Sequence, residues 1–439
     1  MLCRRLKIWS FVLLGIGDCL GVQAQPGDTL QLSVEQLFEL GVANSLVLQA
    51  DALEEEVAGL QQRTARADRL PDLNVGLQGA YVGQPVIFRR GLSDPYHPDV
   101  PRWSQNYAVD VSQKIYSGGR VKYTVRKAEL EASLAALQTG GDRSAVKLSL
   151  MGQYLELFNL YRQEQVLNRN IEESERRLQD IRRMKREGLI TTNDVLRSEM
   201  QLTDDQLALQ QTRNNLRIAS QQLDILLGLE ETLMLVPDTT LLSEPLPVGS
   251  YESYVAEACD LDPTLAQLRM QTELARNEVP LARSVLLPDL SAYASNTLAR
   301  PIARTQEDLY NNGWNIGLSL TMPLSNLYKE NHRIRATGLG VALRQNAEQQ
   351  RIQQLRVEVR TAYLRHEEAL QEVEALRLSA RQARENYRIM QNRYLNQLAI
   401  LTDLLDANAV LLEVELQLTA ARTRVIYTYY QLLEVTGRL

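Results

Sequence analysis

Two long stretches without proline constrain the fold of this chain more than any other feature. One stretch covers Arg120 to Arg186 and the other covers Tyr328 to Asn396. Folded as a helix, with about 1.5 Å of rise per residue, each stretch would be on the order of 100 Å long. An ordinary globular domain is too small to enclose such helices. The sequence therefore predicts an elongated, mainly α-helical molecule.

Shorter predicted helices, 194–229 and 403–435, carry an apolar residue at every seventh position, which is typical of a coiled-coil seam. Charged residues such as Asp204, Asp205 and Arg213 are expected on the faces between the seams. Two more helices, 46–69 and 263–286, would stack end to end with these to run beside the long ones. The apolar series are Val195, Leu202, Leu209, Leu216 and Leu223, then Leu404, Leu411, Leu418, Val425 and Leu432.

The chain repeats itself. Leu70-Pro71-Asp72-Leu73 returns at positions 287–290, and further along Tyr154, Asp194 and Gly228 recur 209 positions later as Tyr363, Asp403 and Gly437. The spacing changes across a proline-rich segment, 84–101, as surface loops tolerate. We therefore expect two copies of one structural unit, 25–230 and 250–439, joined by a linker, 231–249.

Each copy contains two short segments in which apolar and polar residues alternate, as strands with one apolar face do. Such strands could lie on a core, or form a barrel with lipid outside and water inside. Four strands cannot close a barrel or cover their edges, so the barrel hypothesis requires several chains. The predicted strands are 72–82, 106–116, 289–298 and 313–323.

The first 24 residues resemble a secretory signal peptide. Arg4, Arg5 and Lys7 precede a short apolar run, 8–17, and Ala24 follows at a suitable cleavage position. Cys19 leaves a lipid anchor open as an alternative. Beyond this segment we expect no helical membrane span, because no run of about twenty apolar residues occurs.

The composition argues against several functional classes. A net charge of -6 gives no basic patch for nucleic acid. No phosphate-binding loop, HExxH or nucleophile elbow occurs, so we expect neither an enzyme nor a cofactor. Three cysteines and three histidines are too scattered for a metal cluster. We expect Cys259 to be a small buried residue, and His97, His332 and His366 to have no ligand role.

The chain contains two LPDL motifs that open strands, QKIYSGG (113–119), TMPLSN (321–326) and the paired segments LITTNDVL (189–196) and LAILTDLL (398–405). Taken together, these motifs resemble those of the TolC family of outer-membrane efflux proteins. The resemblance covers the whole mature chain. It implies a homotrimer: a twelve-stranded barrel in the outer-membrane lipid of a Gram-negative-type bacterium, continued by an α-helical tunnel in the periplasm. It also implies export of small molecules or proteins that arrive from an inner-membrane pump, of RND or ABC type, through a periplasmic adaptor.

The resemblance also suggests roles for the two paired segments, which would be helical tips at the periplasmic end of the tunnel. Two acids would ring the entrance, where crowded carboxylates attract cations, and three residues would hold it shut. The chain departs from the family at Gln397, where glycine is usual, and at Ala399, where the best-known member has a gate arginine. The entrance residues are Asp403, Asp406, Asp194, Asn193 and Tyr394, and the adaptor-contacting residues are Gly188, Leu189, Ile190, Leu398 and Ala399.

Two alternatives stay open from the residues alone. The tip acids could serve helix capping: Thr402 is a candidate N-cap before Asp403, and Thr192 or Asn193 a candidate before Asp194. The whole chain could instead be a secreted, elongated coiled-coil scaffold or adaptor protein. The scaffold hypothesis explains the helices but not the strands in duplicated positions.

Overall fold

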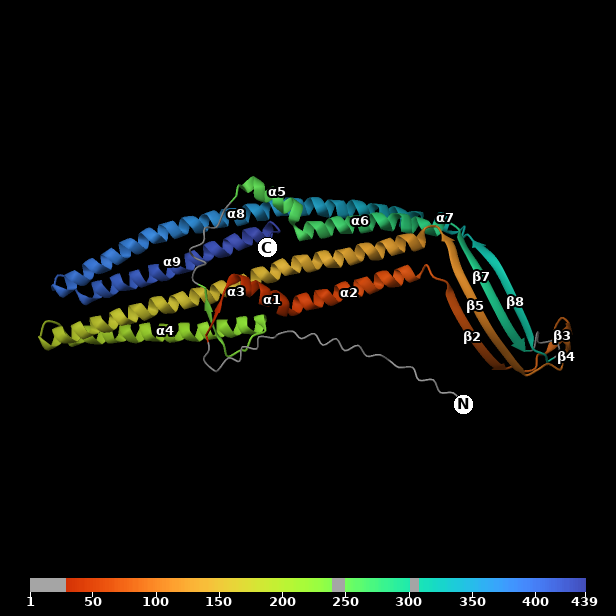
Figure 1. The fold of residues 1–439 in the computed structure, drawn as a ribbon, viewed down its shortest axis with the longest axis horizontal. Helices are drawn as coiled ribbons and strands as arrows, with labels where there is room; N and C mark the ends of the chain where they lie inside the picture. Colours follow the sequence, from red (N-terminus) through yellow and green to blue (C-terminus); the bar gives the residue numbers. More distant parts are fainter. Residues whose placement is uncertain (1–28, 239–248, 301–307) are drawn as a thin grey trace, which may run out of the picture.

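The computed structural model describes residues 29–238, 249–300 and 308–439. The predicted signal peptide and Cys19 lie outside these residues. The molecule is a long rod of helices with a small sheet attached at one end (Figure 1). The helical hairpin tips lie at the opposite end.

The helices follow the same order in both copies of the unit. A short helix leads into one of about twenty residues, then come the strands, one very long helix and its coiled partner. No helix in the described ranges is both long enough and apolar enough to cross a membrane. The first copy contains α1 (Val34–Asn44), α2 (Leu46–Ala67), α3 (Arg120–Arg186) and α4 (Thr192–Leu227); the second contains α5 (Tyr251–Leu261), α6 (Pro263–Arg283), α7 (Asn326–Lys329), α8 (Asn331–Leu395) and α9 (Leu401–Val435).

The rod is built from coiled pairs, α3 with α4 and α8 with α9, which are joined where α3 packs on α9 (Figure 1). Four of the five seam residues in α4 are buried, and Leu202 is half-buried. Asp205 is an exception to the predicted pattern of exposed charges, because it is buried. Its partners are described with the site below.

Four antiparallel strands form the main sheet, in the order β2-β5-β7-β8. Asp72 pairs with Ser112 across the first two strands, and Asp289 pairs with Thr321 across the last two. β2 and β8 have no neighbour on their outer sides within the described chain, and the apolar rows of the sheet are exposed. The strands are β2 (Asp72–Tyr81), β5 (Trp103–Ser117), β7 (Asp289–Arg300) and β8 (Asn311–Thr321).

Two smaller pairs of strands were not predicted. β1 (Thr29–Leu32) pairs in parallel with β6 (Met234–Pro237), although about 200 residues separate them. Inside the proline-rich segment, β3 (Ile87–Arg90) and β4 (Ser93–Tyr96) form a hairpin at the far end of the sheet (Figure 1). Each of these strands has four residues, too few for a period of two to be recognised.

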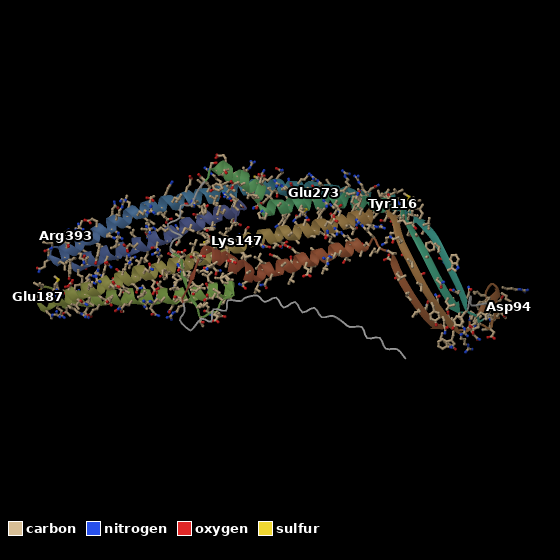
Figure 2. All side chains as sticks on the ribbon, viewed as in Figure 1. Asp94, Tyr116, Lys147, Glu187, Glu273 and Arg393 are labelled. Carbon is tan, nitrogen blue, oxygen red and sulfur yellow. The ribbon has the colours of Figure 1, made fainter. Side chains whose placement is uncertain are left out.

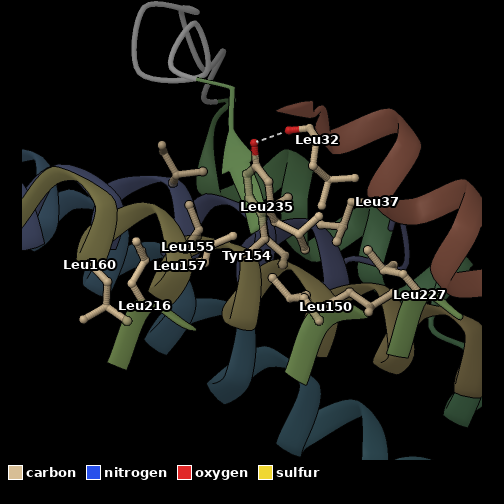
Figure 3. Packing of buried hydrophobic residues seen from close by; sticks show 13 residues of the cluster. Leu32, Leu37, Leu150, Tyr154, Leu155, Leu157, Leu160, Leu216, Leu227 and Leu235 are labelled. Carbon is tan, nitrogen blue, oxygen red and sulfur yellow. Dashed lines mark hydrogen bonds between the residues drawn. The ribbon is translucent and has the colours of Figure 1, made fainter. Parts of the chain in front are cut away.

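The largest apolar cluster lies where the β1–β6 pair meets α3. Tyr154 is fully buried at its centre, among leucines that include Leu37, Leu227 and Leu235 (Figure 3). The Tyr154 hydroxyl donates to the Leu32 carbonyl at 2.9 Å and accepts from the Asp238 backbone N–H at 2.9 Å. This side chain therefore fastens both strands to the long helix.

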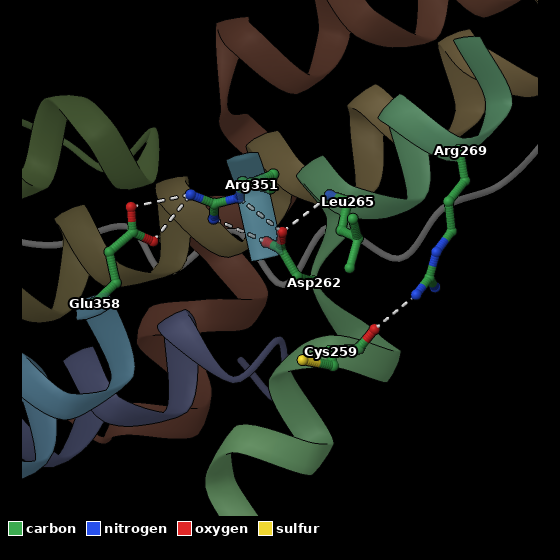
Figure 4. A network of polar contacts seen from close by, with 6 residues as sticks. All are labelled: Cys259, Asp262, Leu265, Arg269, Arg351 and Glu358. Carbon is green, nitrogen blue, oxygen red and sulfur yellow. Dashed lines mark hydrogen bonds and ion pairs between the residues drawn. The ribbon is translucent and has the colours of Figure 1, made fainter. Parts of the chain in front are cut away.

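A buried ion pair organises the junction between α5 and α6. Asp262 caps α6 by accepting from the Leu265 backbone N–H at 2.9 Å, and it also pairs with Arg351 at 3.0 Å (Figure 4). Arg351 reaches Glu358 at 2.9 Å as well. Nearby, Cys259 is half-buried, not buried as the sequence suggested, because it lies off the face of α5 that buries Tyr254 and Ala258.

Candidate functional site: the paired helical tips

The two tips lie at the end of the rod far from the sheet, as the labels Glu187 and Arg393 show against Asp94 in Figure 2. One tip joins α3 to α4 and the other joins α8 to α9. Both turns close in the same way. The Leu189 N–H donates to the Met184 carbonyl at 3.0 Å, and the Leu398 N–H donates to the Arg393 carbonyl at 2.8 Å.

The residue at the sharpest point of each turn has a left-handed backbone. Gly188 has a φ of 75° and Gln397, its equivalent in the second copy, has a φ of 61°. Glycine adopts this conformation readily, whereas a residue with a Cβ is strained in it. Gln397 therefore keeps the glycine geometry at a cost in stability.

Asp194 is engaged in capping α4. Thr191 is the N-cap residue, so the candidates Thr192 and Asn193 were wrong. Asp194 accepts from the Thr191 backbone N–H at 2.9 Å and from its hydroxyl at 2.7 Å, which completes a capping box. Asn193 is exposed beside it on the first turn.

The second tip is capped differently. Ile400 is the N-cap residue of α9 and offers no side-chain acceptor, so the expected Thr402 cap was wrong. The Thr402 hydroxyl instead accepts from the Arg197 guanidinium at 2.8 Å, and this bond ties α9 to α4. Asp403 lies in the uncapped first turn, where a carboxylate interacts favourably with the helix dipole.

The predicted entrance residues divide into two groups. Asp403 and Asp406 are both exposed on the first turns of α9. Tyr394 is buried, and its hydroxyl has no hydrogen-bond partner among the described residues. Burial raises the pKa of Tyr394, and the nearby Asp194 carboxylate raises it further. The fold therefore places Asp194 near Tyr394, while Asp403 and Asp406 face solvent.

The tips expose apolar side chains at their extremities. Leu189 is 48% exposed and Leu398 is 67% exposed, whereas Ala399 is half-buried. Ile190 packs partly into the apolar cluster behind the tips. Ile400, 66% exposed, extends this surface and was missed by sequence reasoning, although LAIL places it in an apolar run.

A buried polar network lies behind the tips and was also missed. Asp205 on α4 accepts from Asn170 at 2.9 Å and from Ser174 at 3.1 Å, both on α3. Asn408 on α9 donates to Asn170 at 3.1 Å, and a further branch runs from Arg177 on α3 to the Tyr387 hydroxyl of α8 at 3.0 Å. Arg177 also donates to Ser174, so the helices α3, α4, α8 and α9 share one connected set of polar contacts, which fixes their alignment.

The sequence model described as outer membrane efflux protein matches the chain twice, over residues 38–229 and 255–438. None of the curated proteins compared with the chain matches it. The two matched segments fall one in each copy of the repeated unit.

Solved structures of outer-membrane channels share the fold. The chain resembles OprN (16% identity, TM-score 0.76, covering 92% of this chain and 90% of that one). It also resembles VceC of Vibrio cholerae (17% identity, TM-score 0.73, covering 92% of this chain and 96% of that one). A third similar structure is the open state of MtrE of Neisseria gonorrhoeae (16% identity, TM-score 0.71, covering 92% of this chain and 88% of that one). At these identities the structures show the fold, while the double match of the family model shows the family. The chain therefore belongs to the outer membrane efflux protein family, and it is an efflux channel protein of the outer membrane that extends into the periplasm.

Proposed function

We propose that three copies of this chain form a closed channel-tunnel that exports small molecules or proteins. The observation that carries this proposal is the pair of open sheet edges, β2 and β8, in a sheet of only four strands. An open edge offers unpaired backbone groups that pair readily with another strand. Edge-to-edge pairing of three chains would give twelve strands and leave no edge open.

The flanks of the helical rod support the same assembly. Within the chain, α3 packs on α9; the duplication implies that α8 of one copy packs on α4 of the next. Both flanking helices expose apolar side chains that such packing would cover. These are Leu196, Met200, Leu207 and Ile218 on α4, and Val357, Leu364, Leu378 and Ile389 on α8.

In this proposal the exposed apolar tips dock a periplasmic adaptor, which connects the tunnel to an inner-membrane pump of RND or ABC type. The docking surface is Leu189 and Leu398 with Gly188, Ile190 and Ala399. The exposed acids Asp403 and Asp406, six carboxylates in three chains, line the entrance and attract cations. Tyr394, Asn193 and Asp194 hold the entrance shut from behind.

Site-specific photo-crosslinking in cells tests the docking role. A photoreactive residue at Leu189 is expected to capture a periplasmic adaptor, identified by mass spectrometry. The matched control is Leu343, which is 72% exposed on α8, in the half of that helix that begins beside the sheet. Adaptor capture from Leu189 and not from Leu343 supports the proposal. Capture only of other copies of this chain, or of unrelated periplasmic proteins, supports the scaffold alternative instead.

A further inference from the structure

We propose that a cavity between α3, α8 and α9 binds a soluble anion that carries phosphate groups. The cavity, called here the arginine cavity, has a volume of about 500 Å³. This volume is in the range of small-molecule sites in proteins, roughly 300–1,000 Å³. Its wall brings together five arginines from three helices: Arg169, Arg377, Arg381, Arg384 and Arg422.

The positive charge of the arginine cavity is only partly compensated. Its two acids are already paired, Glu374 with Arg377 at 2.5 Å and Glu415 with Arg384 at 2.5 Å. Among the described residues, the other three arginines of the wall have no carboxylate within ion-pair distance. A cluster of three uncompensated cations stands out in a chain whose net charge is -6. Such a cluster attracts anions.

The surroundings of Arg422 add a second, geometric observation. A smaller cavity of about 140 Å³ shares Arg422 and Arg169 with the arginine cavity and adds Arg162 to the wall. The Arg162 Nε is buried and has no hydrogen-bond partner in the described chain. Burial lowers the pKa of Arg422, and Arg377 and Arg162 lower it further. An anion placed here would accept from the unmatched donor and relieve the repulsion.

The duplicated unit shows that the fold does not require the three arginines of α8. Counting 209 positions back, Arg377 corresponds to Asn168, Arg381 to Glu172 and Arg384 to Glu175. The first copy builds the same long helix with neutral or acidic side chains at those positions. Arg422 corresponds to Arg213, which is paired with Glu164 at 2.7 Å, and Arg169 lies in the first copy itself. The three arginines of α8 are therefore what distinguishes the second copy.

The chemistry and position of the arginine cavity indicate the class of ligand. A guanidinium group donates two parallel N–H bonds to a carboxylate or a phosphate, whereas a lysine ammonium acts as a point charge. A phosphate group brings more negative charge than a carboxylate to the three uncompensated arginines. Arg169 lies 49 residues beyond the start of α3 beside the sheet, about 70 Å along the helix. With the sheet end in the outer membrane, lipid head groups are far from this position. The ligand is thus a soluble phosphate-bearing anion.

Isothermal titration of the detergent-solubilised full chain with pyrophosphate, at ionic strength held constant with sodium chloride, tests this inference. We expect saturable binding at one site per chain, weakened at least tenfold by Arg422→Gln and by Arg381→Gln. The control is Arg356→Gln, which should leave the affinity unchanged. Arg356 is an exposed arginine outside the arginine cavity, on α8, the helix that carries Arg381. Short-chain phosphatidylglycerol serves as the lipid arm and should not compete with pyrophosphate.

Absence of saturable pyrophosphate binding to the unaltered chain would overturn the proposal. Equal affinities in all three variants would also overturn it, because they would show general charge screening. Binding of the phosphatidylglycerol but not of pyrophosphate would contradict the soluble ligand. Circular dichroism checks that each variant is folded. Arg381 is exposed and has no partner among the described residues, so Arg381→Gln decides the matter if Arg422→Gln fails to fold.

Discussion

Gln397 is the one tip residue that has a Cβ and a left-handed backbone conformation. Its φ of 61° lies in the left-handed region, and the equivalent residue of the other tip is Gly188. The left-handed conformation costs a residue with a Cβ roughly 1–2 kcal/mol. Glycine loses more conformational freedom on folding than glutamine does, and this loss offsets part of the strain that a substitution of Gln397 by glycine would relieve.

We therefore expect Gln397→Gly to stabilise the fold by about 0.5–1 kcal/mol. Urea unfolding followed by far-UV circular dichroism in detergent would measure the change. Gly188→Ala, which introduces a Cβ at the equivalent position, should destabilise the protein by a similar amount. If both substitutions shifted stability in the same direction, the strain assigned to Gln397 would be wrong.

Asp224 is a buried acid without a partner. Neither carboxylate oxygen has a hydrogen bond among the described residues, and burial, together with the nearby Glu231, raises the pKa of Asp224 to about 6. Between about pH 4 and 6 the unfolded chain has lost this proton while the folded chain retains it. Stability therefore falls as the pH rises through this window, and the loss is complete above it.

Replacing this acid with its amide should remove the pH-dependent loss. A shift of about two pKa units corresponds to on the order of 3 kcal/mol, so Asp224→Asn should stabilise by up to that amount at pH 7.5 and by almost nothing at pH 4. Thermal melts at both pH values would measure this. Asp204→Asn, an exposed acid on the same helix, is the control. A gain that is equal at both pH values would exclude titration of Asp224 as its cause.

At the scale of elements, the long helices could be predicted from the missing prolines, and the seams from the heptads. The capping residues could not, because Thr191, Thr192 and Asn193 can all cap a helix and their order alone does not choose one. The buried Asp205 was also hidden, since Asn170 and Ser174, which donate to it, lie on another helix, α3. The tips themselves were found because the duplication repeats them, whereas β1 and β6 pair across about 200 residues without a pattern.

The Tyr154 hydroxyl is one of the groups that hold the β1–β6 pair against the long helix. Tyr154→Phe removes the bonds to the Leu32 carbonyl and the Asp238 N–H, and should destabilise the protein by about 1 kcal/mol. Hydrogen exchange of the β6 amides should quicken. The control is Tyr427→Phe, since that hydroxyl makes no hydrogen bond in the described chain and its ring packs on the same cluster. Unchanged exchange in the Tyr154 variant would mean that the other contacts of these strands, among them the bond from the Leu235 N–H to the Ser220 hydroxyl, suffice to hold them.

At the scale of the whole molecule, the exposed stripe on α4 is the proposed seam between copies. Leu207 is 57% exposed there, and burying a charge at this seam would oppose assembly. We expect Leu207→Glu to weaken a heat-sensitive trimer band on gels of unheated, detergent-extracted protein. Gln206→Glu, exposed on the same helix about 100° round the axis from Leu207, should leave the band intact. A soluble elongated monomer in the unaltered protein would instead support the scaffold alternative.

The duplication has a consequence for how such a tube can diverge. A ring of six identical units would carry every substitution six times, and all of its seams would change together. With two units in one chain, a substitution appears three times in the proposed trimer, so alternate seams can take different chemistry. One such divergence is the set of arginines at 377, 381 and 384, which correspond to Asn168, Glu172 and Glu175 in the first copy. Covalent linkage also halves the number of contacts that must form between separate molecules, so that assembly loses less translational entropy.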